Sequence, residues 1–190
     1  MYQANLSRAK PVVPASVRGA LRTATADNHE RLDAMFGKFD LADPAAYRSF
    51  LRAHARALLP IEELIAAAGR PDGWLPRSPL LLADLAAIGE AGPSPMPILP
   101  PNAPGLWGMR YVVEGSRLGG ALLARSVGSG LPAAYLGARH GAGEWRAFLD
   151  TLERAGQDGD ETWLNGAIEG AREAFALFAA AATEEMAEHG

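Results

Sequence analysis

Residues 111–120 read Tyr-Val-Val-Glu-Gly-Ser-Arg-Leu-Gly-Gly and place three glycines within six positions of a segment that we expect to be helical. A glycine inside a helix costs roughly 1 kcal/mol relative to alanine, so the cluster needs a reason. Either a neighbouring helix packs close to this backbone, or a flat ligand lies against it where a Cβ atom would clash. The segment by itself leaves both interpretations open.

The rest of the chain also has the patterns of helices rather than strands. Apolar residues recur at helical spacing, and Asp43-Pro44 and Ser78-Pro79 have the cap-plus-proline form of a helix start. The predicted helices span residues 15–36, 44–69, 78–89, 106–127, 132–136, 144–152 and 160–188, with an extended proline-rich loop over residues 91–104. The sequence therefore predicts an all-α chain, with a flexible tail over residues 1–14 and one helical domain over residues 15–190.

Composition excludes several classes of function. The 190 residues contain no cysteine, which removes disulfides, thiolate metal sites and cysteine nucleophiles. The net charge of −4 gives no sign of a nucleic-acid-binding surface. No apolar run reaches the roughly 20 residues that a membrane span needs, and the N-terminus does not resemble a signal peptide. We therefore expect a cytoplasmic protein that binds neither nucleic acid nor membrane.

A second candidate segment lies in the first predicted helix, over Leu21–Asp33. His29 stands at the edge of an apolar stripe, where a neutral imidazole can offer one nitrogen to a metal. Asp33 follows four residues later on the same side, where its carboxylate can accept the other N–H and fix the tautomer. Arg22 lies two turns earlier and could reach an anionic edge of a ligand. Taken alone, His29 is more often a boundary histidine paired with Asp33.

Together the two segments are more specific than either one. The pattern L-R-x-A-T-x-x-x-H-x-x-L-D, followed about 80 residues later by Y-V-x-E-G-S-x-L-G-G, resembles haem oxygenases. The similarity is strongest to the bacterial branch, including members that accompany phytochromes. It implies an all-α, single-domain fold in which a proximal and a distal helix sandwich haem.

The resemblance also implies a role for each matching residue. His29 would be the proximal iron ligand, with Asp33 as its hydrogen-bond partner, and Arg22 and Arg146 would hold the haem propionates. The glycine-rich segment would cover the distal face and carry the catalytic positions Gly115, Ser116, Gly119 and Gly120. Phe175, with Phe148 and Phe178, gives weaker support and would line the haem.

The implied reaction is the conversion of haem b, O2 and electrons to biliverdin, CO and Fe2+. The expected electron donor is a ferredoxin or a flavoprotein reductase, and a phytochrome is a candidate acceptor of the product. Ser116 stands where animal members of the family have an acidic residue that orders water. For this reason a haem-binding carrier or sensor without turnover is the alternative function.

The remaining polar candidates look structural. His54 lies between arginines in the second predicted helix and is expected at the surface or at its boundary. His140 lies in a glycine-flanked loop and is expected to face solvent, as are Glu184, Glu185 and Glu188. Trp145 has the character of a core or boundary aromatic.

Overall fold

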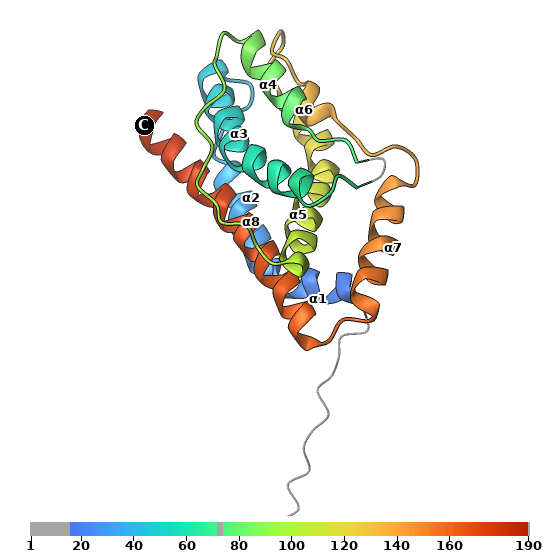
Figure 1. Ribbon diagram of the computed structural model, residues 1–190. Helices are drawn as coiled ribbons and strands as arrows, with labels where there is room; N and C mark the ends of the chain where they lie inside the picture. Colours follow the sequence, from blue (N-terminus) through green and yellow to red (C-terminus); the bar gives the residue numbers. More distant parts are fainter. Residues whose placement is uncertain (1–15, 72–73, 190) are drawn as a thin grey trace, which may run out of the picture.

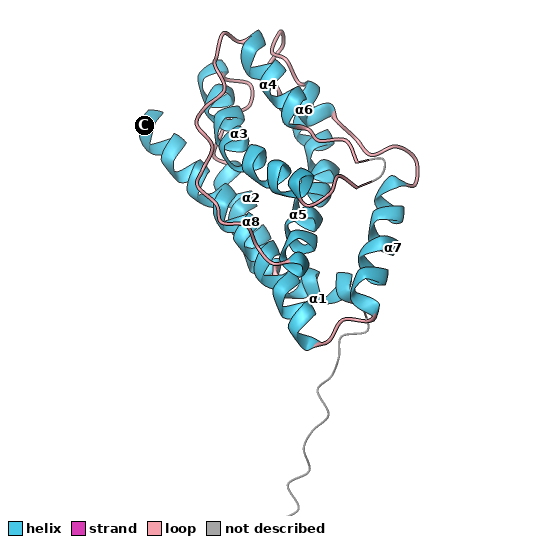
Figure 2. Ribbon diagram, viewed as in Figure 1, coloured by secondary structure: helices cyan, strands magenta, loops and turns pink. Residues whose placement is uncertain are grey.

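The computed structural model describes residues 16–71 and 74–189, and every regular element in this part of the chain is a helix (Figures 1 and 2). The helices are α1 Val17–Ala24, α2 Ala26–Phe36, α3 Pro44–Ala67, α4 Ser78–Ala87, α5 Ala103–Leu123, α6 Ala134–Gly137, α7 Glu144–Gln157 and α8 Glu161–His189, with a 3-10 turn at Ala124–Ser126. The all-α prediction is confirmed. The tail expected over residues 1–14 lies outside the described residues.

The first predicted helix is wrong in one respect, because a break at Thr25 divides it into α1 and α2. Thr25 leaves helical geometry with φ −117° and ψ 8°, and its hydroxyl donates to the Leu21 carbonyl at 2.8 Å. The Ala24 carbonyl, freed at the break, accepts hydrogen bonds from Nε and Nη2 of Arg172 on α8 at 3.3 and 3.2 Å. The segment that carries His29 is thus a separate helix whose start is tied to α8.

The helices α5 and α8 cross in close contact (Figure 1). A Cβ atom on Gly108 of α5 would lie 1.8 Å from the Ala167 carbonyl oxygen, and one on Gly170 of α8 would lie 2.1 Å from the Gly105 carbonyl oxygen. The two backbones therefore touch at a contact that only glycine permits on both sides. Above and below this point the helices bury apolar residues such as Met109 and Ala171.

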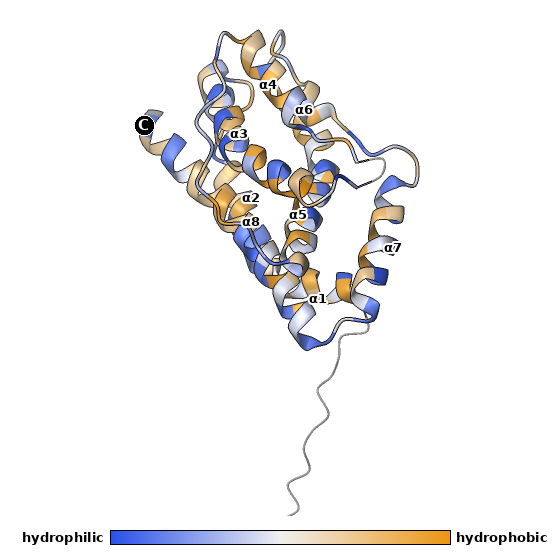
Figure 3. Cartoon of the chain, viewed as in Figure 1, coloured by the Kyte–Doolittle hydropathy of each residue, from blue (hydrophilic) through white to orange (hydrophobic). Residues whose placement is uncertain are grey.

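The long helix α3 lies across α8. Polar and apolar residues alternate along it, and one face of the helix is buried in the core (Figure 3). Pro60 sits inside α3 and lacks the N–H that would bond the Arg56 carbonyl. That carbonyl instead accepts the N–H of Met96 at 2.8 Å, from the proline-rich loop. The Arg56 carbonyl, which Pro60 leaves without its helical partner, thus anchors the proline-rich loop to α3.

The amphipathic helix α7 stands beside α1 and α5. Glu153 of α7 accepts hydrogen bonds from the first two N–H groups of α1, those of Val17 and Arg18, at 2.9 Å each. A carboxylate at this position satisfies unpaired donors and complements the positive end of the helix dipole. The helix is longer than the sequence predicted, because it continues past Leu152 to Gln157. None of the described helices has both the length and the hydropathy needed to cross a membrane.

The α5–α8 contact predicts opposite effects for two glycines of one helix. Gly108→Ala places a Cβ atom inside the α8 backbone and should lower the free energy of unfolding by about 3 kcal/mol or more. Gly119→Ala meets no atom within 4 Å and should raise it by up to about 1 kcal/mol, because alanine is the better helix former. Urea denaturation followed by circular dichroism measures both. Equal stability of the two variants would contradict the crossing.

Candidate functional site

His29 presents its ring on the outer surface of α2, with 65% of the side chain exposed. Its Nδ1 lies 3.0 Å from Oδ2 of Asp33, one turn further along the helix. A carboxylate at Nδ1 holds the proton there and leaves the lone pair of Nε2 free. The ring of Phe175, which projects from α8, approaches His29 edge-on with centroids 6.0 Å apart. The structure thus offers one oriented nitrogen donor beside a buried aromatic ring.

A second exposed surface lies on α5 and is apolar. Gly115, Leu118, Gly119 and Leu122 share one face of the helix by their spacing. Leu118 and Leu122 are 56% and 66% exposed, and a Cβ atom on Gly119 would meet no atom within 4 Å. A stripe of exposed leucines and bare backbone is typical of a surface that a flat apolar ligand covers. We call these four residues the glycine–leucine face.

Gly120 does not belong to the glycine–leucine face. It is buried, and a Cβ atom there would lie 3.1 Å from the Leu136 carbonyl oxygen of α6. At 3.6 residues per turn, Gly120 stands roughly 140° around the helix from Gly115. Close helix packing, the first of the two interpretations of the glycine cluster, therefore accounts for Gly120, which lets α6 approach α5. Helical spacing alone could have separated it from the other two.

Exposed arginines lie on α1 and in the first turn of α7. Burial raises the pKa of Tyr111 of α5, and the positive charges of Arg18 and Arg22 on α1 partly offset this, which places both arginines near the phenol. The Tyr111 ring also packs on Trp145, with centroids 6.2 Å apart, and Trp145 directly precedes Arg146 at the start of α7. Arg18, Arg22 and Arg146 are all exposed, so they can meet an anionic group from solvent. The sequence alone suggested no role for Arg18, or for Tyr111, although Tyr111 lies one turn before Gly115.

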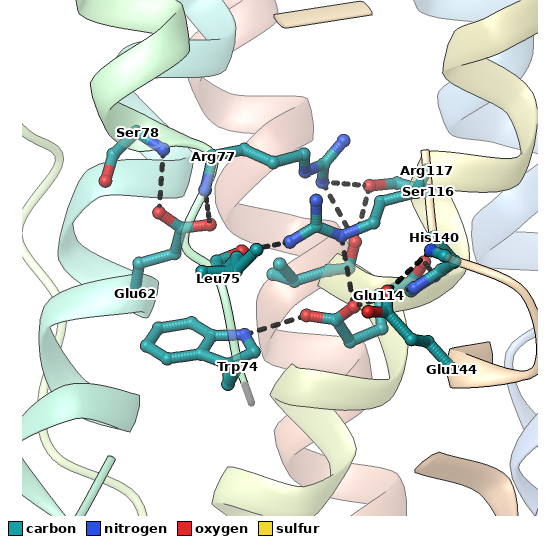
Figure 4. A network of polar contacts seen from close by, with 12 residues as sticks. Glu62, Trp74, Leu75, Arg77, Ser78, Glu114, Ser116, Arg117, His140 and Glu144 are labelled. Carbon is teal, nitrogen blue, oxygen red and sulfur yellow. Dashed lines mark hydrogen bonds and ion pairs between the residues drawn. The ribbon is translucent and has the colours of Figure 1, made fainter. Parts of the chain in front are cut away.

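Ser116 lies next to the glycine–leucine face, and its hydroxyl is already engaged. It donates to the Val113 carbonyl at 2.8 Å and accepts a hydrogen bond from Arg77. Arg77 is only 2% exposed, and it also donates to the Val113 carbonyl at 2.9 Å while its guanidinium lies over the Tyr135 ring. A buried cation thus stands directly behind Ser116 (Figure 4). Sequence reasoning missed Arg77, because nothing local marks an arginine after a proline as buried.

Glu114, the acid that precedes Gly115, is committed to structure. Its carboxylate accepts hydrogen bonds from the Trp74 indole at 2.8 Å and from Arg117 Nε at 3.0 Å, while Arg117 also donates to the Leu75 carbonyl (Figure 4). His140 completes the cluster, with Nε2 3.0 Å from the Glu114 carbonyl oxygen and Nδ1 3.6 Å from its carboxylate. These contacts tie two loops to α5 beside the glycine–leucine face.

Two residues expected in solvent are therefore buried instead. The side chain of His140 is 10% exposed, because its ring is drawn onto Glu114 and packs beside Trp145. Glu185 is fully buried, because Arg52 and Arg56 of α3 bind it at 2.8 and 3.2 Å. Glu184 and Glu188 keep about half of their side chains exposed, as a solvated face should. The partners that bury His140 and Glu185 come from distant segments.

His54 is only partly buried as a residue, as a boundary position should be, but its ring nitrogens are shielded. Nδ1 lies 2.7 Å from the Tyr135 hydroxyl, and Nε2 is buried without a hydrogen-bond partner among the described residues. The rings of Phe36 and Phe50 lie 4.5 and 4.2 Å away. This burial, together with the positive charge of Arg77, lowers the pKa of His54 from 6.5 to about 3.

The two exposed surfaces belong to helices that both pack on α8 without packing closely on each other, within the part of the chain that the structure describes. A search with family models finds no match for this chain. The chain is 32% identical to a haem oxygenase of Xanthomonas campestris pv. campestris, over 72% of this chain and 88% of the relative. The chain belongs to the haem oxygenase family.

A solved structure supports the same fold. The haem oxygenase of Neisseria meningitidis, in its NO- and CO-bound forms, superposes with a TM-score of 0.79 over 91% of this chain and 93% of the other, at 23% identity. Membership makes this chain a haem-degrading oxidoreductase by family, and haem is its implied substrate.

The residues present fit haem. Within residues 16–71 and 74–189, no cluster of three or more His, Asp or Glu side chains could hold a metal by itself. A metal at the single donor His29 therefore needs further ligands, which the four nitrogens of a porphyrin supply. The glycine–leucine face suits the apolar plane of the porphyrin, and the arginines near Tyr111 suit its two carboxylates.

The shielded His54 predicts how stability depends on pH. Below pH 6.5 the unfolded chain protonates this histidine, whereas the folded chain does so only near pH 3. The unfolded state then binds more protons, so stability falls as pH drops through this window, by about 1.4 kcal/mol per pH unit for this one group. Urea denaturation of His54→Phe between pH 6 and 4 should show a shallower pH dependence than wild type.

A second variant separates this titration from the loss of a hydrogen bond. Tyr135→Phe removes the partner of Nδ1 but keeps the imidazole, so it should be less stable at every pH while retaining the wild-type slope. Equal pH slopes for wild type and His54→Phe would show that His54 does not titrate in this way.

Proposed function

We propose that this protein is a biliverdin-producing haem oxygenase that cleaves haem with O2 and electrons to biliverdin, CO and Fe2+. The observation that carries the proposal is the oriented donor of His29, whose Nδ1 is held by Asp33 while Nε2 stays free. When bound, haem supplies both the iron at which O2 is activated and the porphyrin that is oxidised.

His29 would bind the iron on the proximal side. Asp33 would keep the proton on Nδ1 and fix the orientation of the ring, as hydrogen-bond partners of metal-binding histidines do. Phe175 limits how far the imidazole can turn, because its ring stands edge-on at 6.0 Å. A single histidine from the protein would leave the iron able to take up a further small ligand.

The glycine–leucine face would cover the distal side. Gly119 offers backbone without a side chain, so it would let haem and a small ligand approach α5 closely. Leu118 and Leu122 contribute apolar contact area that is exposed in the free protein. Burial of such area stabilises a bound ligand by about 25 cal/mol per Å².

Arg22 and Arg146 would bind the two propionates, together with Arg18 near Tyr111. Arg18 and Arg22 lie on α1 and Arg146 lies in the first turn of α7, and the two helices are joined through Glu153. Guanidinium–carboxylate pairs are directional, and exposed ones are individually weak. Their main effect would be to set the orientation of haem.

Ser116 would act together with Arg77. The serine proton is directed to the Val113 carbonyl, so the group that can place positive charge near the distal face is the buried guanidinium behind it. In a low-dielectric setting such a charge stabilises negative charge that develops nearby. This pairing would take the place of the acidic residue that animal members of the family carry at the position of Ser116.

Titration with haemin, followed by aerobic reduction, tests the proposal. Haemin should give a stoichiometric Soret band, and a reductant with O2 should replace that band by the absorption of biliverdin. A ferredoxin or a flavoprotein reductase is the expected donor. A stable Soret band under efficient reduction would contradict turnover and favour a carrier.

His29→Ala should abolish turnover while the helical circular dichroism spectrum persists, because the exposed ring contributes little to the core. Asp33→Ala should weaken iron ligation roughly 10–100-fold, the usual cost of losing the partner of a ligating histidine. Glu30→Ala, on the same exposed helix, is the matched control. A His29→Ala protein with the native haem spectrum and full turnover would refute the ligand assignment.

Gly119→Leu should block the distal side more than it harms folding. The added side chain meets no protein atom nearby, so thermal stability should stay at or above the wild-type level. Haem affinity and biliverdin yield should both fall, with Gly119→Ala intermediate. Unchanged affinity and yield in Gly119→Leu would place the ligand elsewhere.

A further inference from the structure

The two glycines of the glycine–leucine face have different surroundings. A Cβ atom on Gly119 would meet open space, whereas one on Gly115 would lie 3.7 Å from Cη2 of Trp145. The edge of an indole ring from α7 therefore lies against the backbone of α5 at Gly115. The face is open at Gly119 and bounded at Gly115.

Several contacts hold Trp145 at this boundary. Its ring lies 5.5 Å from Phe148 on α7, 6.2 Å from Tyr111 on α5 and 5.6 Å from His140, measured between centroids. His140 is in turn fixed to the Glu114 carbonyl at 3.0 Å, one residue before Gly115. Trp145 is thus positioned by the same segment of α5 that it limits, and it remains only partly buried.

The next residue along α7 is Arg146, whose side chain is exposed and can meet an anionic group from solvent. A planar ligand held by Arg146 and laid on the glycine–leucine face would meet the indole wherever it extends past Gly115. An aromatic ring packed on three sides is rigid, because moving it would require off-rotamer side chains or lost packing. Trp145 can therefore act as a stop against sliding and rotation of the ligand in its own plane.

We infer that Trp145 is a specificity-determining residue, which bounds the distal face at Gly115 and so selects which meso carbon of haem lies over the open backbone at Gly119. The inference rests on the proposed function. It concerns the seating of haem in the site and its consequence for the biliverdin isomer, and it assigns Trp145 no part in the chemical steps.

The test compares Trp145→Ala and Trp145→Phe with wild type by two measurements. The first is the proton NMR spectrum of the ferric cyanide complex, in which the haem methyl shifts report the in-plane seating without any turnover. The second is chromatography of the biliverdin isomers. Trp163→Phe, at another partly buried tryptophan in the first turn of α8, is the matched control, and circular dichroism checks the fold of each variant.

Trp145→Ala should raise the ratio of minor to major isomer about tenfold or more, the discrimination that one apolar contact typically supplies. A second set of haem methyl signals should appear with it. Trp145→Phe should lie between Trp145→Ala and wild type, and Trp163→Phe should match wild type. Identical methyl shifts and isomer ratios in folded Trp145→Ala would overturn the inference.

The two measurements also separate the inference from the proposed function. Wild-type protein that binds haem but yields no biliverdin would refute the proposed reaction, and the NMR comparison would still decide the role of Trp145. Wild-type protein that binds no haem would overturn both.

Discussion

The architecture depends on the close contact between α5 and α8, where backbone meets backbone. Gly108 and Gly170 permit it, since a Cβ atom at either position would lie about 2 Å or less from a carbonyl oxygen of the other helix. The contact fixes the helix that carries the exposed glycines relative to α8, which also carries Phe175 beside His29. Both candidate walls of the haem site are therefore positioned by contacts with α8. Gly108 lowers the helix propensity of α5, but it permits the contact that fixes α5 against α8.

Charged side chains hold the part of α5 that flanks the glycine–leucine face. Glu114 binds Trp74, Arg117 and His140, and buried Arg77 binds the Val113 carbonyl and Ser116. Buried charges are costly unless they are hydrogen-bonded, so this network favours one arrangement of the surrounding loops. That part of the helix is thus rigid and satisfied, while the glycine–leucine face exposes leucines and bare backbone. This asymmetry suits a helix that receives a flat apolar ligand on one face only.

Much of the candidate site followed from local sequence. The i,i+4 pair of His29 and Asp33 is a geometric property of any helix, so the structure reproduces its spacing directly. The glycine cluster was ambiguous between packing and ligand contact, and packing against neighbouring side chains or backbone accounts for two of its three members. Gly120 accommodates α6, Gly115 accommodates Trp145, and only Gly119 faces open space. Which neighbour stands over each glycine depends on elements up to 30 residues away, and no local pattern encodes it.

The sequence by itself determined the helices, most of their ends, the absence of cysteine chemistry and the pairing of His29 with Asp33. All of these depend on composition or on residues within about one helical turn of each other. Only the tertiary structure decided the break at Thr25, where Arg172 donates to the Ala24 carbonyl. The same holds for the burial of the His140 and Arg77 side chains. The partners in these contacts lie 26 to 148 positions away in the chain. A polar side chain is exposed by default and becomes buried only when folding brings a hydrogen-bonding partner to it, so its place is a property of the assembled fold.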